Sequence, residues 1–319
     1  MNAAELLEPY RAQMLDERHW ELTRRLLDWS LRHTYRRLEP AFYVREAFVS
    51  STFEQYCCPP EATLEENLLG AWFVTCIFKA DDGSTEELTS FLAAPDAPSA
   101  PTELRACHAS FMEALQREGR DTEGPRAAFR ELCAWTCRER GMDSRTVTEA
   151  QYRECRNYTI GVPAYVACWA ALRGLTPSER AQEALRGSGL LEATMELVYS
   201  CNDLGSVEKD EAALRKNPSG GDLNLVLLRA RDVGDREEAI RQVVAHYHER
   251  ARDFLRLRAE LASTEHWRER HVRDFVELLR CVTNGNLHTT RHLMATRYPG
   301  AQALLATLPE LEPFQERLR

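Results

Sequence analysis

The chain has 319 residues, of which 44% are hydrophobic and 29% charged, with a formal net charge of −9 and a pI near 5.6. This length and apolar content suffice to bury a sizeable core, and the acidic balance argues against sequence-independent binding to nucleic acid. Ten cysteines occur without a signal-peptide pattern, and no apolar run approaches the ~20 residues of a membrane span, so buried free thiols in a reduced, cytoplasmic protein are expected.

Hydrophobic residues recur at helical rather than alternating spacing in almost every segment, which predicts an all-α fold. In chain order, helices are expected over residues 6–34 with a break near Asp16, then 43–56, 63–82, 102–116, 127–139, 146–158, 177–186, 189–217, 223–228, 236–261 and 264–279. Capping signals mark their starts: Thr63 with Glu66, Thr146 with Glu149, Thr176-Pro177-Ser178-Glu179, Ser188, and Asp235 with Glu238. No shift in composition divides the chain, so residues 1–319 are predicted to form a single domain.

Two aspartates, Asp81 and Asp82, stand at the end of the third expected helix. The C-terminal end of a helix already presents partial negative charge, and two adjacent carboxylates also repel each other. This placement is therefore unfavourable by itself, and we expect a positive partner beside it.

A row of polar side chains lies on the helix expected over residues 189–217. Asn202, Ser206 and Asp210 stand four residues apart and share one face, where they offer an amide oxygen, a hydroxyl and a carboxylate. Such oxygen donors suit Mg²⁺, which commonly bridges protein carboxylates and substrate phosphates. Lys209 would meet a phosphate oxygen rather than the metal. The row predicts half of a site for a metal-complexed phosphorylated ligand, although similar rows also form solvated helix faces.

The spacing N-D-x-x-S-x-x-K-D from Asn202 to Asp210 closely resembles the second metal motif of bacterial class I terpene synthases. In that family Asn, Ser or Thr, and Glu or Asp bind one magnesium ion. Asp81, Asp82 and Glu86 resemble the aspartate-rich motif of the same family, which implies that they are metal ligands too. Here the third acid comes one position later than in the strict D-D-x-x-D form.

Two further markers of the family lie outside the metal motifs. Arg156 resembles its diphosphate sensor, which implies that Thr159 is the linker and that Ile160 turns its backbone carbonyl toward the substrate. Arg297 and Tyr298 resemble the Arg-Tyr pair that reaches the diphosphate when the site closes. Many relatives carry a Trp shortly after the Gly-Asn segment at residues 285–286, whereas this chain has His and Thr there.

The resemblance implies a class I terpenoid synthase-like domain of about ten to twelve helices around a central apolar cavity. It also implies a magnesium-dependent terpene cyclase, a carbon–oxygen lyase that ionises a linear prenyl diphosphate and cyclises the allylic cation to a hydrocarbon or alcohol. Farnesyl diphosphate is the favoured substrate and geranylgeranyl diphosphate the next. About three Mg²⁺ ions, with Mn²⁺ as an alternative, would act with Arg156, Lys209, Arg297 and Tyr298 on the leaving group. A monomer or homodimer is expected, without nucleic acid or a membrane span.

The allylic cation must be kept from water, which requires an apolar cavity with aromatic faces. The candidate faces, each of which could instead be ordinary core, are Phe48, Phe53, Trp72, Phe73, Phe78, Tyr158, Trp169 and Tyr199. A prenyl chain-elongating transferase is one alternative, but it would need a second D-D-x-x-D motif, which the sequence lacks. A non-catalytic helical interaction protein is another, against which the intact polar motifs and the absence of a repeat period argue.

Overall fold

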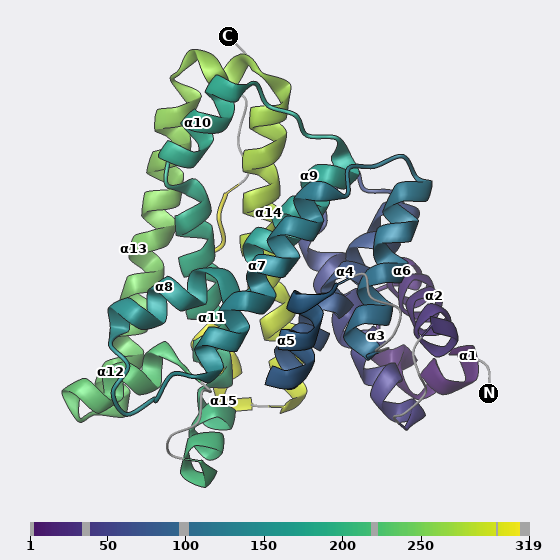
Figure 1. Cartoon of the computed structure of the whole chain (residues 1–319). Coiled ribbons are helices and arrows are strands. Elements are labelled where there is room, and N and C mark those ends of the chain that lie inside the picture. The colour runs from purple at the N-terminus through teal and green to yellow at the C-terminus, as the bar shows by residue number, and fades with distance from the viewer. Residues whose placement is uncertain (1–2, 34–38, 96–101, 218–222, 298, 313–319) are drawn as a thin grey trace.

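The computed structural model describes residues 3–33, 39–95, 102–217, 223–297 and 299–312, with backbone alone for residues 33, 294–297 and 299–300. These parts of the chain form fifteen α-helices and two 3₁₀ helices and contain no strand (Figure 1). The α-helices are α1 (Ala3–Leu7), α2 (Glu17–His33), α3 (Pro40–Cys57), α4 (Leu64–Asp82), α5 (Thr85–Ala93), α6 (Glu103–Arg117), α7 (Glu123–Arg140), α8 (Glu149–Thr159), α9 (Val162–Arg173), α10 (Glu179–Gly187), α11 (Leu190–Lys216), α12 (Leu225–Val233), α13 (Arg236–Ala262), α14 (Arg270–Arg297) and α15 (Pro299–Leu305). The 3₁₀ helices are η1 (Glu8–Gln13) and η2 (Glu265–Arg268).

The all-α prediction is confirmed, and ten of these α-helices have eleven residues or more. The total exceeds the predicted ten to twelve because α5, α9 and α15 have no counterpart among the predicted ranges, and the segment predicted over residues 6–34 divides into α1, η1 and α2. Among the described residues, no helix combines the length and apolar character that crossing a bilayer requires. All ten cysteines are free thiols, and eight of them are buried.

Local capping chemistry fixes several helix starts. Thr63 and Glu66 form the expected capping box, and Asp235 accepts from the first backbone amides of α13. The predicted caps of α8 and α10 are wrong. The box of α8 uses Thr148 with Gln151, because the predicted Thr146 lies in a turn that closes on Asp143. The cap of α10 is Ser178, two residues later than predicted. Gly189 directly precedes α11, and the predicted Ser188 does accept from the first amide of that helix, Leu190, at 3.3 Å.

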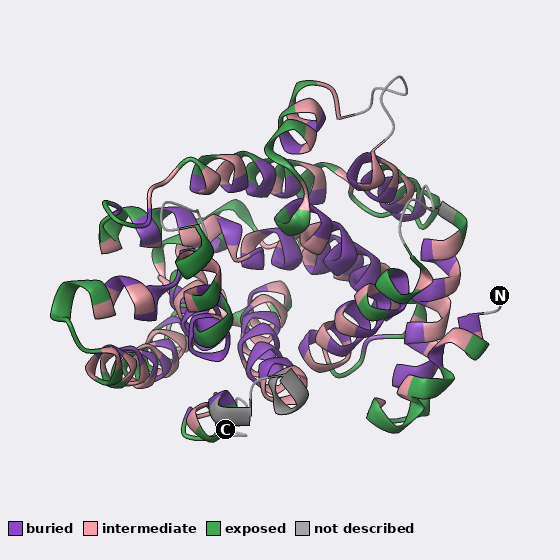
Figure 2. Ribbon diagram, turned by 90° about the horizontal axis from the view of Figure 1, so that it is seen from below, coloured by how far each residue is buried: buried purple, intermediate pink, exposed green. Residues whose placement is uncertain are grey.

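The central helices bury residues on several sides and therefore lie inside the molecule. On α4, residues 70–76 are consecutively buried, a pattern typical of a helix that is surrounded by others. The sequence does not reveal this central position, because apolar residues are abundant in many of its segments. Figure 2 shows the buried positions concentrated on the inner helices and the exposed ones at the periphery. Around the centre, α3 packs against α4 and α14, and α11 packs against α13 and α14.

One glycine sets how closely α3 and α14 approach. A Cβ added to Gly285 would lie 2.5 Å from the Tyr56 carbonyl oxygen and 2.5 Å from the Cys57 Cα, both backbone atoms of α3. Backbone cannot rotate away as a side chain can, so only glycine fits at this crossing without separating the helices.

We expect Gly285→Ala to lower the free energy of unfolding by about 3 kcal/mol, the upper end of the usual overpacking cost. Urea denaturation measures this change. Gly187→Ala is the matched control, since a Cβ there would meet nothing within 4 Å. Equal stability of the two variants would contradict the tight crossing.

Candidate active site

A cavity of about 470 Å³ lies between α3, α4, α9, α11 and α14, with the end of α8 at its edge. Its walls are mainly apolar, formed by Phe48, Val49, Phe53, Val74, Ile77, Phe78, Val162, Tyr165, Val198, Val282 and Leu293. Its charged and amide groups come from the predicted motifs, α3 and α14, and they are Arg45, Asp81, Arg156, Asn202, Lys209 and Asn286. Residues that are distant in the sequence thus line one cavity, which has both charged or amide groups and a mainly apolar wall.

Asp81 reaches this cavity from the last turn of α4. Its side chain is exposed to the hollow, yet the surrounding protein desolvates it and raises the pKa of its carboxyl, with Asp82 adding to the rise and Arg156, Lys209 and Arg140 opposing it. The Arg140 guanidinium, from α7, donates to the Asp81 carbonyl oxygen at 2.6 Å. Arg140 is therefore the positive partner of this helix end, and the carboxylate itself stays available to a cation in the cavity.

The other two residues of the aspartate-rich motif do not line this cavity. Asp82 and Glu86 border a separate hollow of about 530 Å³, beside Lys79 and Glu103. The physical reason is that consecutive residues of a helix point about 100° apart, so Asp81 and Asp82 cannot face the same space. Asp82 and Glu86 thus line a different hollow from Asp81, and their metal-ligand role stays a prediction.

Arg156 joins the two motifs. It lies in the last turn of α8, and its Nη2 donates to Asn202 Oδ1 at 3.1 Å and stands 3.5 Å from Asp203 Oδ1. Burial alone would lower the pKa of this guanidinium, but Asp203 and other acidic neighbours, including Asp81, hold it above its ordinary value. The side chain is therefore a permanent cation fixed at the polar end of the cavity.

The break after α8 places Thr159 and Ile160 on the cavity wall. It occurs at Gly161, whose φ of 78° is in the left-handed region that favours glycine. A Cβ there would also lie 2.9 Å from Ile77 Cγ2 of α4. Backbone conformation and packing thus both require glycine at the point where the helix turns beside the cavity.

Within the second motif only part of the polar row faces the cavity. Asn202 and Lys209 line it, whereas Ser206 and Asp210 are 9% and 8% exposed and lie beneath the wall. The Ser206 hydroxyl donates to Asp210 Oδ2 at 2.5 Å, and Asn224 Nδ2 donates to the same oxygen at 2.8 Å. The three residues of the row lie along one side of the helix, as their spacing predicts. The Asp210 carboxylate, however, already accepts a hydrogen bond from the side-chain amide of Asn224.

Asp203 is the second residue of the N-D-x-x-S-x-x-K-D pattern, but sequence reasoning assigned it no role. It is fully buried, accepts from the Tyr152 hydroxyl and accepts from the Leu225 amide at 2.7 Å. Burial raises the pKa of its carboxyl to about 6, against the opposing effects of Arg156, Leu225 and Tyr152. These contacts fix the Asp203 side chain in the position from which it orients Arg156. The sequence does not predict them because the partners are far apart along the chain.

The last predicted marker falls at the edge of what is described. Tyr298 lies outside the described residues, and Arg297 ends α14 with only its backbone described. The roles of both residues stay predictions.

Three of the aromatic candidates, Phe48, Phe53 and Phe78, line the cavity. The other five do not line it and belong to the packed interior or to other contacts. They are Trp72 (against Trp29), Phe73 (between Phe111 and Phe129), Tyr158 (stacked on Trp135), Trp169 (fully buried) and Tyr199 (against Tyr152). Periodicity finds the buried face of a helix but cannot say which neighbour that face meets, so it also missed Tyr165 and Arg45.

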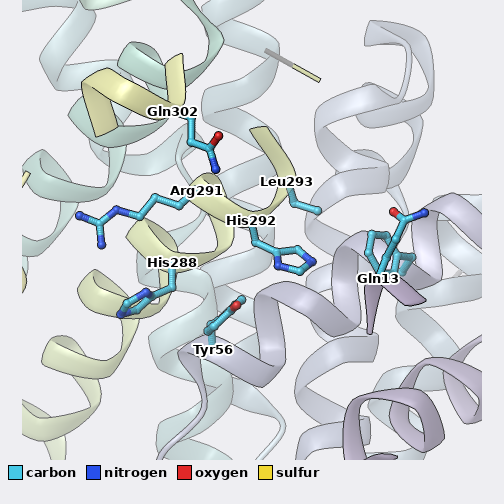
Figure 3. Close-up of a pocket in the computed structure, with 8 residues that line it drawn as sticks. Gln13, Tyr56, His288, Arg291, His292, Leu293 and Gln302 are labelled. Carbon is cyan, nitrogen blue, oxygen red and sulfur yellow. The ribbon is translucent and has the colours of Figure 1, made fainter. Parts of the chain in front are cut away.

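A neighbouring hollow of about 460 Å³ shares two wall residues with the cavity, Phe48 and Leu293. Figure 3 shows its polar lining, with His288, Arg291 and His292 on α14, Tyr56 on α3 and Gln302 on α15. Phe48 and Leu293 therefore stand between two spaces.

The donors at the polar end of the cavity meet the needs of a divalent cation in part. Among the described residues, no three or more His, Cys, Asp or Glu side chains form a ready metal-binding group. The cavity instead offers the Asp81 carboxylate and the Asn202 amide oxygen, with Ser206 and Asp210 one and two turns further along α11. These are hard oxygen donors of the kind that Mg²⁺ prefers. The residues present therefore fit a magnesium-type ion.

Comparison with known proteins gives one family match. The model of terpene synthase family 2, C-terminal metal binding, matches residues 77–253, which include Asp81, Arg156 and the whole row from Asn202 to Asp210. A search of curated protein sequences finds no match.

Several solved structures share the fold. A linalool/nerolidol synthase from Streptomyces clavuligerus, in complex with 2-fluorogeranyl diphosphate, is 22% identical with a TM-score of 0.65, covering 87% of this chain and 99% of that one. A germacradien-4-ol synthase from Streptomyces citricolor is 17% identical with a TM-score of 0.67, covering 87% and 95%. A variant of cucumene synthase is 21% identical with a TM-score of 0.64, covering 86% and 95%.

Proposed function

The chain belongs to terpene synthase family 2 and is a class I terpene synthase, and we propose that it is a magnesium-dependent cyclase of a linear prenyl diphosphate. The observation that carries this proposal is one cavity with Asp81, Arg156, Asn202 and Lys209 among its polar groups and aliphatic and aromatic walls beyond them. Such a space suits a ligand with an anionic head and a hydrocarbon tail.

The polar groups would act on the diphosphate. Arg156 is held charged and oriented by Asp203, so its guanidinium can donate to diphosphate oxygens without first reorganising. Lys209, which is half exposed with its Nζ 3.6 Å from Asp210 Oδ1, can reach a second oxygen. Asp81, Asn202, Ser206 and Asp210 would hold magnesium, which when bound supplies the Lewis acidity that neutralises the leaving group.

The apolar walls would act on the carbon chain. Phe48, Phe53 and Phe78 present rings to the cavity, and an aromatic face stabilises a nearby cation by about 0.5 to 2 kcal/mol when water is excluded. The same walls keep water from the cation, which favours ring closure over early quenching. We favour farnesyl diphosphate as the substrate, with geranylgeranyl diphosphate next and residues 1–319 acting as one domain.

Incubation with geranyl, farnesyl and geranylgeranyl diphosphate, followed by gas chromatography with mass spectrometry, tests this function. Cyclic terpenes and released diphosphate are expected with Mg²⁺, less or altered product with Mn²⁺, and none in excess chelator. Full activity in chelator would overturn the proposal. Addition of isopentenyl diphosphate tests the chain-elongating alternative, which predicts longer prenyl diphosphates instead of hydrocarbons.

Cavity size gives a prediction about chain length. Phe48→Ala should join the cavity to the neighbouring hollow of about 460 Å³, because its ring is shared by both walls. We expect the ratio of kcat/KM for geranylgeranyl over farnesyl diphosphate to rise roughly tenfold, the usual effect of a change in pocket size. Tyr56→Phe, which changes only the neighbouring hollow, should leave the ratio unchanged. A fall in both activities without a change in ratio would contradict this role of Phe48.

A further inference from the structure

Glu54, on α3, is a buried carboxyl that the proposed chemistry leaves unused. Glu54 is 0% exposed, and its Oε1 has no hydrogen-bond partner among the described residues. Burial raises the pKa of Glu54 to about 8, while Tyr165 and Trp169 lower it by hydrogen bonding. The Trp169 indole nitrogen lies close enough to lower the pKa of Glu54, but among the described residues it forms no hydrogen bond of good geometry. A carboxyl held in this way, without a cation as partner, is costly, and such groups cluster at functional sites.

Among the titratable groups packed around Glu54, none competes with it as a proton donor or acceptor near neutral pH. Cys57 and Cys58 belong to the same helix, while Tyr165 and Cys168 come from α9, and burial raises the pKa of all four. They therefore stay neutral. From α4, Gly70 clears the space, since a Cβ there would lie 2.5 Å from Glu54 Oε2.

Tyr165 connects this carboxyl to the cavity. It lines the cavity wall, packs edge-on against Phe53 with ring centroids 5.3 Å apart, and its hydroxyl donates to Glu54 Oε2 at 2.8 Å. The two oxygens can exchange roles at this distance, because hydrogen positions follow the protonation state. When Glu54 carries a proton, its Oε2–H can donate to the Tyr165 oxygen, and the phenol proton is then free to turn toward the cavity.

We propose that Tyr165 and Glu54 form a proton relay that protonates a neutral olefinic intermediate during cyclisation, an inference that rests on the proposed function. The π electron pair of the olefin forms a new C–H bond with the phenol proton as the Tyr165 O–H bond breaks. Glu54 passes its own proton to the Tyr165 oxygen and becomes a carboxylate. Tyr165 is thus the catalytic residue that faces the substrate, and Glu54 acts through it.

The relay is restored within the same turnover. Protonation creates a new carbocation in the cavity, on the other side of Tyr165 from the Glu54 carboxylate, and the two charges attract each other in an environment shielded from water. Loss of a proton from a carbon beside the cation forms the product double bond, and that proton returns through Tyr165 to Glu54. The neutral polyene itself forms when the first carbocation loses a proton to the departing diphosphate, so the relay needs no co-reactant beyond the substrate.

Deuterium labelling tests the relay. The O–H hydrogens of Tyr165 and Glu54 exchange with solvent between turnovers, so in D₂O the wild-type product should contain one deuterium bound to carbon. Tyr165→Phe keeps the ring but loses the hydroxyl, so we expect formation of the labelled product to fall roughly a hundredfold, with an unlabelled olefin accumulating instead. Glu54→Gln should do the same. Tyr56→Phe, a phenol outside the cavity, is the matched control and should keep the label.

The possible outcomes distinguish failure of the proton relay from failure of the proposed function. Unlabelled product from the wild type, or labelled product formed at the wild-type rate by folded Tyr165→Phe or Glu54→Gln protein, overturns the relay and leaves the proposed function intact. Thermal melting of both variants establishes that they are folded, and either variant alone suffices for the test. The absence of any terpene product from the wild type would instead overturn the proposed function and the relay with it.

Discussion

Asn202→Ala is expected to slow magnesium-dependent diphosphate release roughly a thousandfold, which corresponds to about 4 kcal/mol of lost transition-state stabilisation. Asn202 lines the cavity and accepts from Arg156, so under the proposed function its loss removes a metal ligand and also loosens the guanidinium that binds the diphosphate. Folding should survive, because its side chain is only partly buried at the cavity edge. The melting temperature without metal should stay near that of the wild type.

Variants on the same helix make this result decisive. Asn202→Asp keeps an oxygen in place and should retain far more activity than alanine, whereas Glu208→Ala changes an exposed position on α11 and should have little effect. Asp210→Ala should lose both activity and stability, because Ser206 and Asn224 would be left without their shared acceptor. Diphosphate release at the wild-type rate from Asn202→Ala protein would refute the metal-ligand role.

The second large effect concerns stability. Unfolded chains ionise Glu54 near its ordinary pKa of 4.5, whereas the folded protein holds the proton until about pH 8. Unfolding then releases a proton, so wild-type stability should fall as the pH rises from about 4.5 to about 8. Glutamine cannot ionise, so we expect Glu54→Gln to gain stability over the wild type by on the order of 4 kcal/mol across this interval.

Urea denaturation of the wild type and Glu54→Gln at several pH values measures the difference. Other titrating groups are common to both proteins and cancel in the comparison. Glu61→Gln is the control, because Glu61 has an 82% exposed side chain and water solvates its charge in both states. A difference between Glu54→Gln and wild type that does not vary with pH would show that Glu54 is ionised in the fold.

Local chemistry explains what the sequence could predict. The capping box of Thr63 and the polar row from Asn202 depend on residues a few positions apart, and the helix repeat places such residues in space. The same repeat also predicts that Asp81 and Asp82 diverge, but the resemblance to a two-aspartate motif suggested a shared site.

Long-range contacts explain what the sequence could not predict. Tyr165 looks like ordinary core on an apolar helix, and nothing local to it indicates that Glu54, 111 residues away, supplies its hydrogen-bond acceptor. Asp203 likewise depends on Tyr152 and Leu225, which lie 51 and 22 residues away. Which helices become neighbours is decided by packing of the whole chain, and side-chain periodicity contains no signal for it.

The side chain of Asn224 links the second metal motif on α11 to the start of α12 by hydrogen bonds. Its side-chain oxygen caps α12 by accepting from Val226, while its amide nitrogen donates to Asp210 and to the Asp203 carbonyl. A cation that draws Asp210 toward the cavity must therefore compete with the residue that starts α12. If Asp210 binds a metal ion as proposed, reciprocity requires that whatever stabilises the start of α12 weakens metal binding, and that bound metal would destabilise the start of α12 by the same free energy. The stability of the first turn of α12, a helix that does not line the cavity, would thus report whether a metal ion is bound there.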